Sequence, residues 1–188
     1  MLKNFKVSND QFDALLNSHV SAYENSYVSA FEGSQVEAYA GSVVEAYADS
    51  VVSSYSGARV NARKGSFVYA FSDSKVCAFM ESSVEALENS YVTAYADSYV
   101  NAFKFSFVEA FEGSTVIAHV GARVDAYSGS TVDALSGSYI TASEGSHVYA
   151  FDGSNVVAYE GATVYYCEGA NLKIACDKEK VNIVCMED

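Results

Sequence analysis

Small and apolar side chains return along this chain every eight residues. From Ser18 to Leu172, twenty octads follow one another without insertion or deletion. Most octads carry the pattern Ser-x-Val-x-Ala, in which valine recurs from Val20 to Val164, with Ile140 as an exception. Alternation of small or β-branched residues with variable polar ones is the period expected of a strand with one buried face. The pattern therefore predicts one short strand in every octad.

The position before the serine predicts a turn in every octad. All twelve glycines of the chain occupy it, from Gly33 to Gly169, and most other octads have Asn or Asp there, with Glu81 and Phe105 as exceptions. Gly, Asn and Asp reach left-handed backbone conformations at low cost. A helix is excluded, because a residue of this kind every eight positions would interrupt it before it became stable.

Strands and turns of equal length predict an all-β fold, a parallel β-solenoid. In such a fold, neighbouring coils stack and bury the apolar side chains that a single coil would leave exposed. A coil could hold two octads and form a flat, two-sheeted solenoid, or three octads and form a triangular one. The inward residues are small, and a triangular core would need larger side chains to reach native packing density. We therefore expect sixteen residues in each coil, and ten coils would form a rod of roughly 50 Å over residues 18–172.

An aromatic residue usually follows the alanine and is predicted to lie beside the turn. Neighbouring coils would place these rings about 5 Å apart along the edges of the solenoid, where they can stack and seal the core. A stacking platform for bases or sugars is the alternative. Arg63, His119, Ser143 and Cys167 interrupt this column.

The two ends depart from the octad and are predicted to form caps, since unpaired strand edges would otherwise be exposed. In residues 1–17, the segment Ser8-Asn9-Asp10-Gln11 matches a helix capping box, and Phe12, Leu15 and Leu16 follow at helical spacing. A short helical N-terminal cap is the expectation. Residues 173–188 are predicted to form two apolar strands around a polar turn, either as a C-terminal β cap or as a dimer contact.

The chain is strongly acidic, with a formal net charge of −13. The acids of the repeats follow the valine, follow the aromatic residue or occupy the turn, and all are predicted to face water. With sixteen residues in each coil, Glu144 would lie beside Glu160, Asp152 beside Glu168, and Glu109 beside Asp125. Such rows serve either solubility or a cationic partner. The candidate binding residues are Glu37, Glu45, Glu85, Glu109, Glu112, Asp125, Asp133, Glu144, Asp152, Glu160 and Glu168.

Four basic residues gather within three octads: Arg59, Arg63, Lys64 and Lys75. This cluster indicates either a local ion-pair patch or a point at which the rod is oriented against a partner.

Motifs of catalysis do not stand out. The histidines His19, His119 and His147 are separated by many coils, and the sequence has no P-loop, G-x-G-x-x-G or H-E-x-x-H. We expect no enzyme activity, cofactor or metal. A zinc site built from Cys167, Cys176 and Cys185 is the alternative to reduced thiols packed in the C-terminal cap.

The N-terminal sequence has no basic segment followed by an apolar one, and no apolar run approaches the length of a membrane span. These features predict a location inside a cell, in the cytoplasm.

The octad G-S-x-V-x-A-Y/F-x resembles repeats of phage and prophage proteins of gut Firmicutes, over Ser18 to about Leu172. The acidic, coiled build is also similar to that of the pentapeptide-repeat proteins that mimic duplex DNA and occupy gyrase. The period here is eight rather than five, and the central residue is Val rather than Leu or Phe, so this second resemblance is one of architecture alone.

These observations predict a non-enzymatic interaction protein, an acidic rod that mimics a nucleic acid and blocks a DNA-binding enzyme. The phage resemblance implies a host defence nuclease as target, as for anti-CRISPR or anti-restriction proteins. The partner would be a protein with a basic nucleic-acid-binding surface, with no direct binding of nucleic acid or membrane. The alternatives are a structural or adhesive solenoid, such as a phage fibre segment, with homodimers through the caps, and an ice-binding protein, which the mixed outward residues make less favoured.

Overall fold

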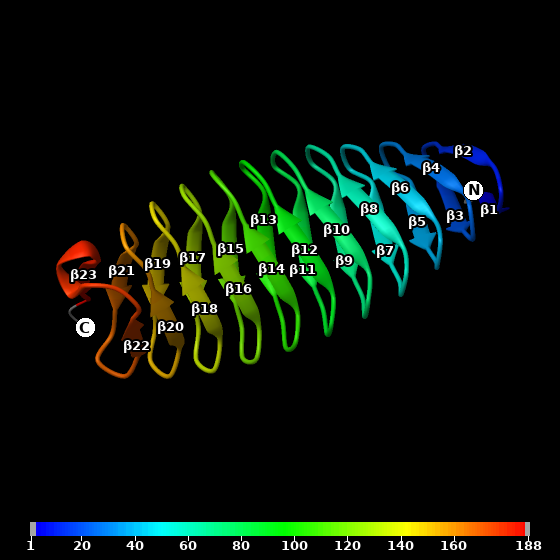
Figure 1. Cartoon of the computed structure of the whole chain (residues 1–188). Coiled ribbons are helices and arrows are strands. Elements are labelled where there is room, and N and C mark those ends of the chain that lie inside the picture. Colours follow the sequence, from blue (N-terminus) through cyan, green and yellow to red (C-terminus); the bar gives the residue numbers. More distant parts are fainter. Residues whose placement is uncertain (1–2, 187–188) are drawn as a thin grey trace.

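The computed structural model describes residues 3–186, which form a flat parallel β-solenoid (Figure 1). The chain winds in one direction, so the N- and C-terminal ends of the described chain lie at opposite ends of the rod. Two sheets face each other across the core, with the odd-numbered strands in one and the even-numbered strands in the other.

The first sheet, called sheet A here, has twelve strands. They are β1 (Lys3–Val7), β3 (Ser18–Ala22), β5 (Gln35–Ala38), β7 (Val51–Ser54), β9 (Phe67–Ala70), β11 (Ser83–Ala86), β13 (Tyr99–Ala102), β15 (Thr115–Ala118), β17 (Thr131–Ala134), β19 (His147–Ala150), β21 (Thr163–Tyr166) and β23 (Asn182–Cys185).

The second sheet, sheet B, has eleven strands. They are β2 (Gln11–Ala14), β4 (Tyr27–Ala30), β6 (Val43–Ala46), β8 (Arg59–Ala62), β10 (Lys75–Ala78), β12 (Tyr91–Ala94), β14 (Phe107–Ala110), β16 (Arg123–Ala126), β18 (Tyr139–Ala142), β20 (Asn155–Ala158) and β22 (Asn171–Ile174). A 3₁₀ helix, η1 (Lys178–Lys180), lies between β22 and β23.

The strand register confirms two octads in each coil. Val76 of β10 pairs with Val92 of β12, sixteen residues later, and the same spacing holds through the repeats. Eleven coils result, one more than the ten octad pairs between Ser18 and Leu172, because strands β1 and β2 add a coil before them.

The serine of each octad closes the turn that precedes its strand. At Ser42, the backbone N–H and the hydroxyl both donate to the Tyr39 carbonyl oxygen, at 3.0 and 2.5 Å. Ala58 keeps the backbone bond to Tyr55 at 2.9 Å and has no hydroxyl. The turn therefore needs a small residue here, and the hydroxyl donates a second hydrogen bond to the same carbonyl oxygen.

The core is a thin layer of small side chains. The inward valines and alanines from Val20 to Val164 are at most 2% exposed, and most of the serines are buried beside them. Because most inward residues stack on the same residue type in the next coil, a side chain of another size would disturb both neighbouring coils.

The predicted helical N-terminal cap is wrong, because the segment forms the first coil as strands β1 and β2. Phe12 pairs with Val28 in the inward valine column, and Asn9 and Asn17 take the left-handed turn conformation, with φ of 55° and 62°. The octad thus continues upstream through β2 with larger residues, whereas β1 pairs with β3 at a spacing of fifteen residues. Pairing with strands β3 and β4 satisfies the backbone groups that a helix would have bonded internally.

Two C-terminal strands flank a polar turn and extend the two sheets, and the first of them, β22, begins before the predicted cap and keeps the sixteen-residue register of the repeats. Strand β22 pairs with β20, and β23 pairs with β21. Thr163 aligns with Asn182, nineteen residues later, because η1 lengthens this last connection. The outer edges of β22 and β23 pair with no other strand of residues 3–186.

Candidate interaction surfaces

The eleven acids selected from the sequence lie on four sides of the rod. Sheet A carries Glu37, Glu85 and Asp133, and sheet B carries Glu45, Glu109 and Asp125. The turns that lead from sheet B to sheet A carry Glu112, Glu144 and Glu160, and the opposite turns carry Asp152 and Glu168. They therefore do not form one continuous surface.

Glu109 and Asp125 are neighbours on sheet B, as predicted from the sixteen-residue coil. The Tyr91 hydroxyl donates a hydrogen bond to the Glu109 carboxylate. Burial, followed by this bond and the charge of Glu109, raises the pKa of Tyr91 to about 12. Burial also raises the pKa of Tyr127, with smaller contributions from Asp125 and Glu109. Phenols that stay protonated are suited to donate to these two carboxylates.

On sheet A, Glu37 is surrounded by donors of its own chain. Its carboxylate accepts from the Ser21 and Tyr39 hydroxyls, both at 3.2 Å, and lies 3.5 Å from Nε2 of His19. Burial and the charge of Glu37 raise the pKa of Tyr39. Farther along sheet A, burial raises the pKa of Asp133.

Glu45 is the exception to the prediction that the acids face water, since it is only 7% exposed. Its carboxylate accepts from Asn61 at 2.5 Å and from Nε of Arg63 at 2.8 Å. The hydrogen bond that Arg63 donates to Glu45 raises the pKa of Arg63, although burial opposes this shift. The Arg63 guanidinium also lies 4.8 Å from the centre of the Phe79 ring. This ion pair is part of the packing and is less suited to bind a partner.

The four clustered cations divide into two kinds. Arg63 pairs with Glu45, and Lys64 pairs with Glu81 at 3.1 Å between exposed side chains. Arg59 and Lys75 are register neighbours on sheet B, and no carboxylate of residues 3–186 lies within 4.0 Å of either. Local ion pairing therefore accounts for half of this cluster.

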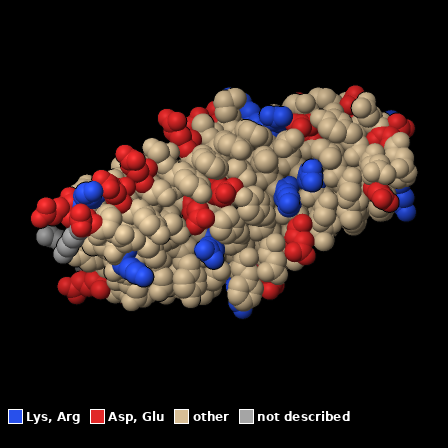
Figure 2. Space-filling view, viewed as in Figure 1, with Lys and Arg blue, Asp and Glu red and all other residues tan. Residues whose placement is uncertain are grey.

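A longer row of carboxylates lies on one edge of the rod, and we call it the acidic edge. It follows the turns from sheet B to sheet A and consists of Glu32, Asp49, Glu81, Asp97, Glu112, Glu144 and Glu160, all exposed. Red side chains gather along the upper edge of Figure 2, toward the C-terminal end. Lys180 pairs with Glu160 at 3.2 Å.

The sequence selection contained three of these seven residues. Four were missed: Glu32, which occupies the same octad position as the three, and Asp49, Glu81 and Asp97, which occupy the turn position. Alternate octads share an edge, so sorting the acids by alternate octads would have revealed the row.

The aromatic columns stack along both edges, as predicted. Tyr23, Tyr39, Tyr55 and Phe71 form one run with ring centres 4.9 to 5.0 Å apart. On the other edge, Phe79, Tyr95, Phe111 and Tyr127 are 4.8 to 5.5 Å apart. These stacks stiffen the edges on which the acids lie.

The four cysteines, Cys77, Cys167, Cys176 and Cys185, are free. Burial raises the pKa of the Cys77 thiol. Within residues 3–186, no three His, Cys, Asp or Glu side chains come together in a group that could hold a metal ion. In the same part of the chain, no helix has the length and apolar character needed to cross a membrane.

No protein-family model and no curated protein sequence matches this chain. Among solved structures, the chain is similar to a TibC-catalysed, hyper-glycosylated fragment of TibA, with 11% identity and a TM-score of 0.46. The match covers 99% of this chain and 93% of that one. The phage-type resemblance of the octad therefore stays a prediction.

Proposed function

We propose that this chain is a non-enzymatic interaction protein whose acidic edge binds the basic nucleic-acid-binding surface of a protein partner. The observation that carries the proposal is the row of seven exposed carboxylates on one edge. Carboxylates in such a row compete with phosphates for lysine and arginine side chains, which gain affinity by releasing counterions.

The spacing of the row is set by the backbone. Turns of neighbouring coils are joined by hydrogen bonds, for example from the Gly145 N–H to the Gly161 carbonyl oxygen at 2.9 Å. Glu144 and Glu160, which precede these glycines, are thus held on adjacent coils. A rigid array loses little conformational entropy when it binds, which favours affinity at a given charge.

The charge density of the acidic edge is lower than that of DNA. Seven carboxylates over nine coils, at about 4.8 Å for each coil, give roughly one carboxylate per 6 Å. The ion pairs of Glu81 with Lys64 and of Glu160 with Lys180 lower the net charge of the row further. One strand of duplex DNA carries about one charge per 3.4 Å. We therefore expect the complex to dissociate at lower salt than the complex of the same partner with DNA.

The partner class is a nuclease or another DNA-binding enzyme with a basic channel. The resemblance of the octad to phage repeats favours a host defence nuclease, and an inhibitor of anti-CRISPR or anti-restriction type acting in the host cytoplasm. The proposal includes no direct contact with nucleic acid or membrane.

The test is a pulldown with the purified, immobilised protein from a bacterial lysate that expresses CRISPR and restriction nucleases. Retention of a DNA-binding enzyme at low salt, with release at high salt and by duplex DNA, is the expected result. The triple variant Glu112→Gln, Glu144→Gln and Glu160→Gln should lose most of this retention, because it removes three charges from the acidic edge.

A matched variant separates the edge from the net charge. Glu88→Gln, Asp152→Asn and Glu168→Gln remove three charges from the turns on the opposite edge, and this variant should retain the enzyme. Equal losses in both triple variants would mean that net charge, rather than the acidic edge, governs retention. If no basic enzyme is retained at any salt concentration, the mimic proposal fails.

The open ends of the sheets favour a second candidate, a structural or adhesive solenoid. Strands β1 and β2 at one end and β22 and β23 at the other each have an edge unpaired within residues 3–186. Parallel edges of this kind can continue into another copy of the chain. Light scattering across a concentration series would show elongated oligomers if this is the function and a monomer if it is not.

A further inference from the structure

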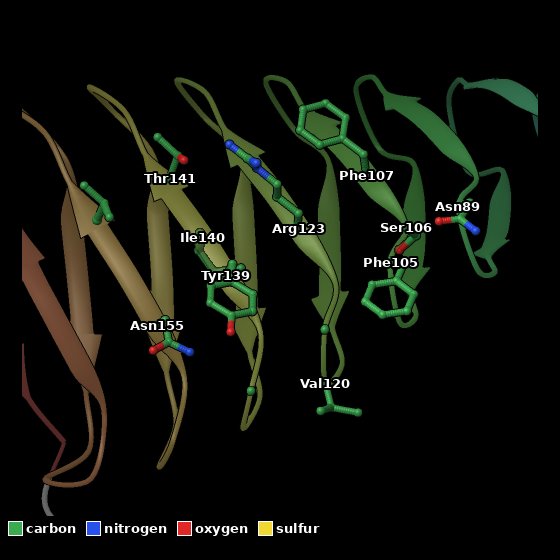
Figure 3. A pocket seen from close by; sticks show the side chains of 13 residues that line it. Asn89, Phe105, Ser106, Phe107, Val120, Arg123, Tyr139, Ile140, Thr141 and Asn155 are labelled. Atoms are coloured by element: carbon green, nitrogen blue, oxygen red, sulfur yellow. The ribbon is translucent and has the colours of Figure 1, made fainter. Parts of the chain in front are cut away.

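A groove lies on the side of the molecule away from the acidic edge, between the turns that leave sheet A and the outer face of sheet B (Figure 3). Its volume is about 920 Å³, and it is lined in part by Phe105, Val120, Arg123 and Tyr139. This volume is within the range of sites that bind small molecules.

The groove lies where a turn with a bulky residue is followed, in the next two coils, by turns with glycine. Phe105 takes the left-handed conformation, with φ of 62°, and is 54% exposed. The next two coils have Gly121 and Gly137 at this position, and neither glycine adds a side chain to the groove. A Cβ on Gly121 would lie 3.0 Å from Cγ of Lys104, whose side chain lies over this glycine. A Cβ on Gly137 would lie 2.8 Å from Cγ2 of Val120, which therefore lies close over that glycine.

Phe105 is the bulkiest residue in a column where most octads have Gly, Asn or Asp. A bulky side chain in the left-handed region carries backbone strain, and such strain is found mainly at functional sites. The Phe105 side chain is also exposed, so burial of its ring does not offset the backbone strain. Val120 and Tyr139, which are 63% and 56% exposed, extend the apolar surface across the groove.

Two cations border this apolar surface. The Arg123 guanidinium carbon lies 5.9 Å from the centre of the Phe107 ring, and Nζ of Lys104 lies 4.7 Å from the centre of the Phe105 ring. Within the described chain, no carboxylate is within 4.0 Å of either cation. Unpaired cations beside exposed rings are unexpected in a protein with a net charge of −13.

We infer that the groove is a binding site for a small aromatic anion. The ring of the ligand packs on Phe105, Val120 and Tyr139, and its carboxylate or sulfonate pairs with Arg123. Burial of the ring supplies most of the binding free energy, and the charge-assisted hydrogen bonds select an anion over a neutral aromatic molecule. A polyanion such as nucleic acid is disfavoured, because the net charge of −13 on the protein repels it.

The test uses two fluorescent probes that differ in charge. Anilinonaphthalene sulfonate carries an aromatic system and one anionic group, and N-phenylnaphthylamine is its neutral counterpart. Titration of the full chain should show tighter binding of the sulfonate than of the neutral dye, by about tenfold, which corresponds to one charge-assisted hydrogen-bonded pair.

Two substitutions separate the parts of the site. Phe105→Gly should weaken binding of both dyes, and Arg123→Thr should weaken binding of the sulfonate alone, so that the preference for the anion is lost. Both new residues occur at equivalent positions elsewhere in the repeats, as Gly121 and Thr131, so the variants should fold. Far-ultraviolet circular dichroism would verify this.

Matched controls place the same changes away from the groove. Glu81→Gly lies at the same octad position on the acidic edge, and Arg59→Thr lies on sheet B four coils from Arg123. Neither should alter binding of either dye. The inference is overturned if the sulfonate does not bind, if the two dyes bind equally well, or if the controls reduce binding as much as Phe105→Gly and Arg123→Thr do.

Discussion

The inward and outward positions of a single strand follow opposite rules in this molecule. In β13, Val100 faces the core, with a valine at the same position in the coils before and after it. Its neighbour Asn101 faces outward, between Glu85 and Ile117. The interior repeats one solution to packing, and this leaves the outward columns free to vary. Function is therefore to be sought in the outward columns and at the turns.

The largest expected effect on stability comes from a charge placed at the inward position of β13, compared with the same charge at the neighbouring outward position. Val100→Asp buries a carboxylate at a position that is 0% exposed, and it should destabilise the protein by about 4 kcal/mol or more. Asn101→Asp introduces the same charge one residue later and should change the free energy of unfolding by less than about 0.5 kcal/mol. Urea unfolding followed by circular dichroism measures both, and similar losses in the two variants would contradict the orientation of β13.

Glu45 occupies an outward strand position but is buried, and its ion pair with Arg63 provides the second prediction. Arg63→Ala leaves the buried Glu45 carboxylate without its cation, while Asn61 still donates to it. A loss of about 2 kcal/mol is expected, below the usual value for a fully buried pair because Arg63 is partly exposed. Lys64→Ala breaks the exposed pair with Glu81 and should cost less than about 0.5 kcal/mol. Equal losses in urea unfolding would show that Glu45 is no more buried than Glu81.

The third prediction concerns Phe105 at the turn position of the octad, where a substitution by glycine should stabilise the protein. Phe105→Gly relieves the left-handed strain of a bulky residue and should raise the free energy of unfolding by about 1 kcal/mol. The same variant is expected to weaken dye binding in the groove. A gain in stability together with a loss of binding would be typical of a strained functional residue. A loss of stability would mean that the Phe105 ring contributes to packing.

The repeat made most of the fold predictable. A serine, valine and alanine at fixed spacing, with a glycine before them, determine strand, turn and inward face in every octad, and their small volumes favour two octads in each coil. The first coil was not predicted, because Phe12 replaces the valine and Leu15 the aromatic residue. Their spacing also fits a helix, and only the pairing of β2 with β4 distinguishes the two.

The surface was less predictable than the core. Outward residues do not repeat, so their grouping depends on which octads share an edge or a sheet. The acidic edge follows from the coil size once that is known. The burial of Glu45 does not, because it depends on where the long Arg63 side chain lies. The groove depends equally on the absence of side chains at Gly121 and Gly137, which a search for motifs passes over.

The smallest effect is expected from the hydroxyl of Tyr91, an outward residue bonded to a candidate site residue. Its pKa is raised to about 12 from the ordinary value of 10.0, chiefly by burial and then by Glu109. The unfolded chain therefore loses this proton at lower pH than the folded protein does. The stabilising contribution is complete below pH 10 and is lost as the pH rises toward about 12. In Tyr91→Phe, stability should fall less steeply across this range than in the wild type. Tyr99→Phe, at the same octad position on sheet A, is the control, and an equal change in slope in both variants would exclude Glu109 as part of the cause.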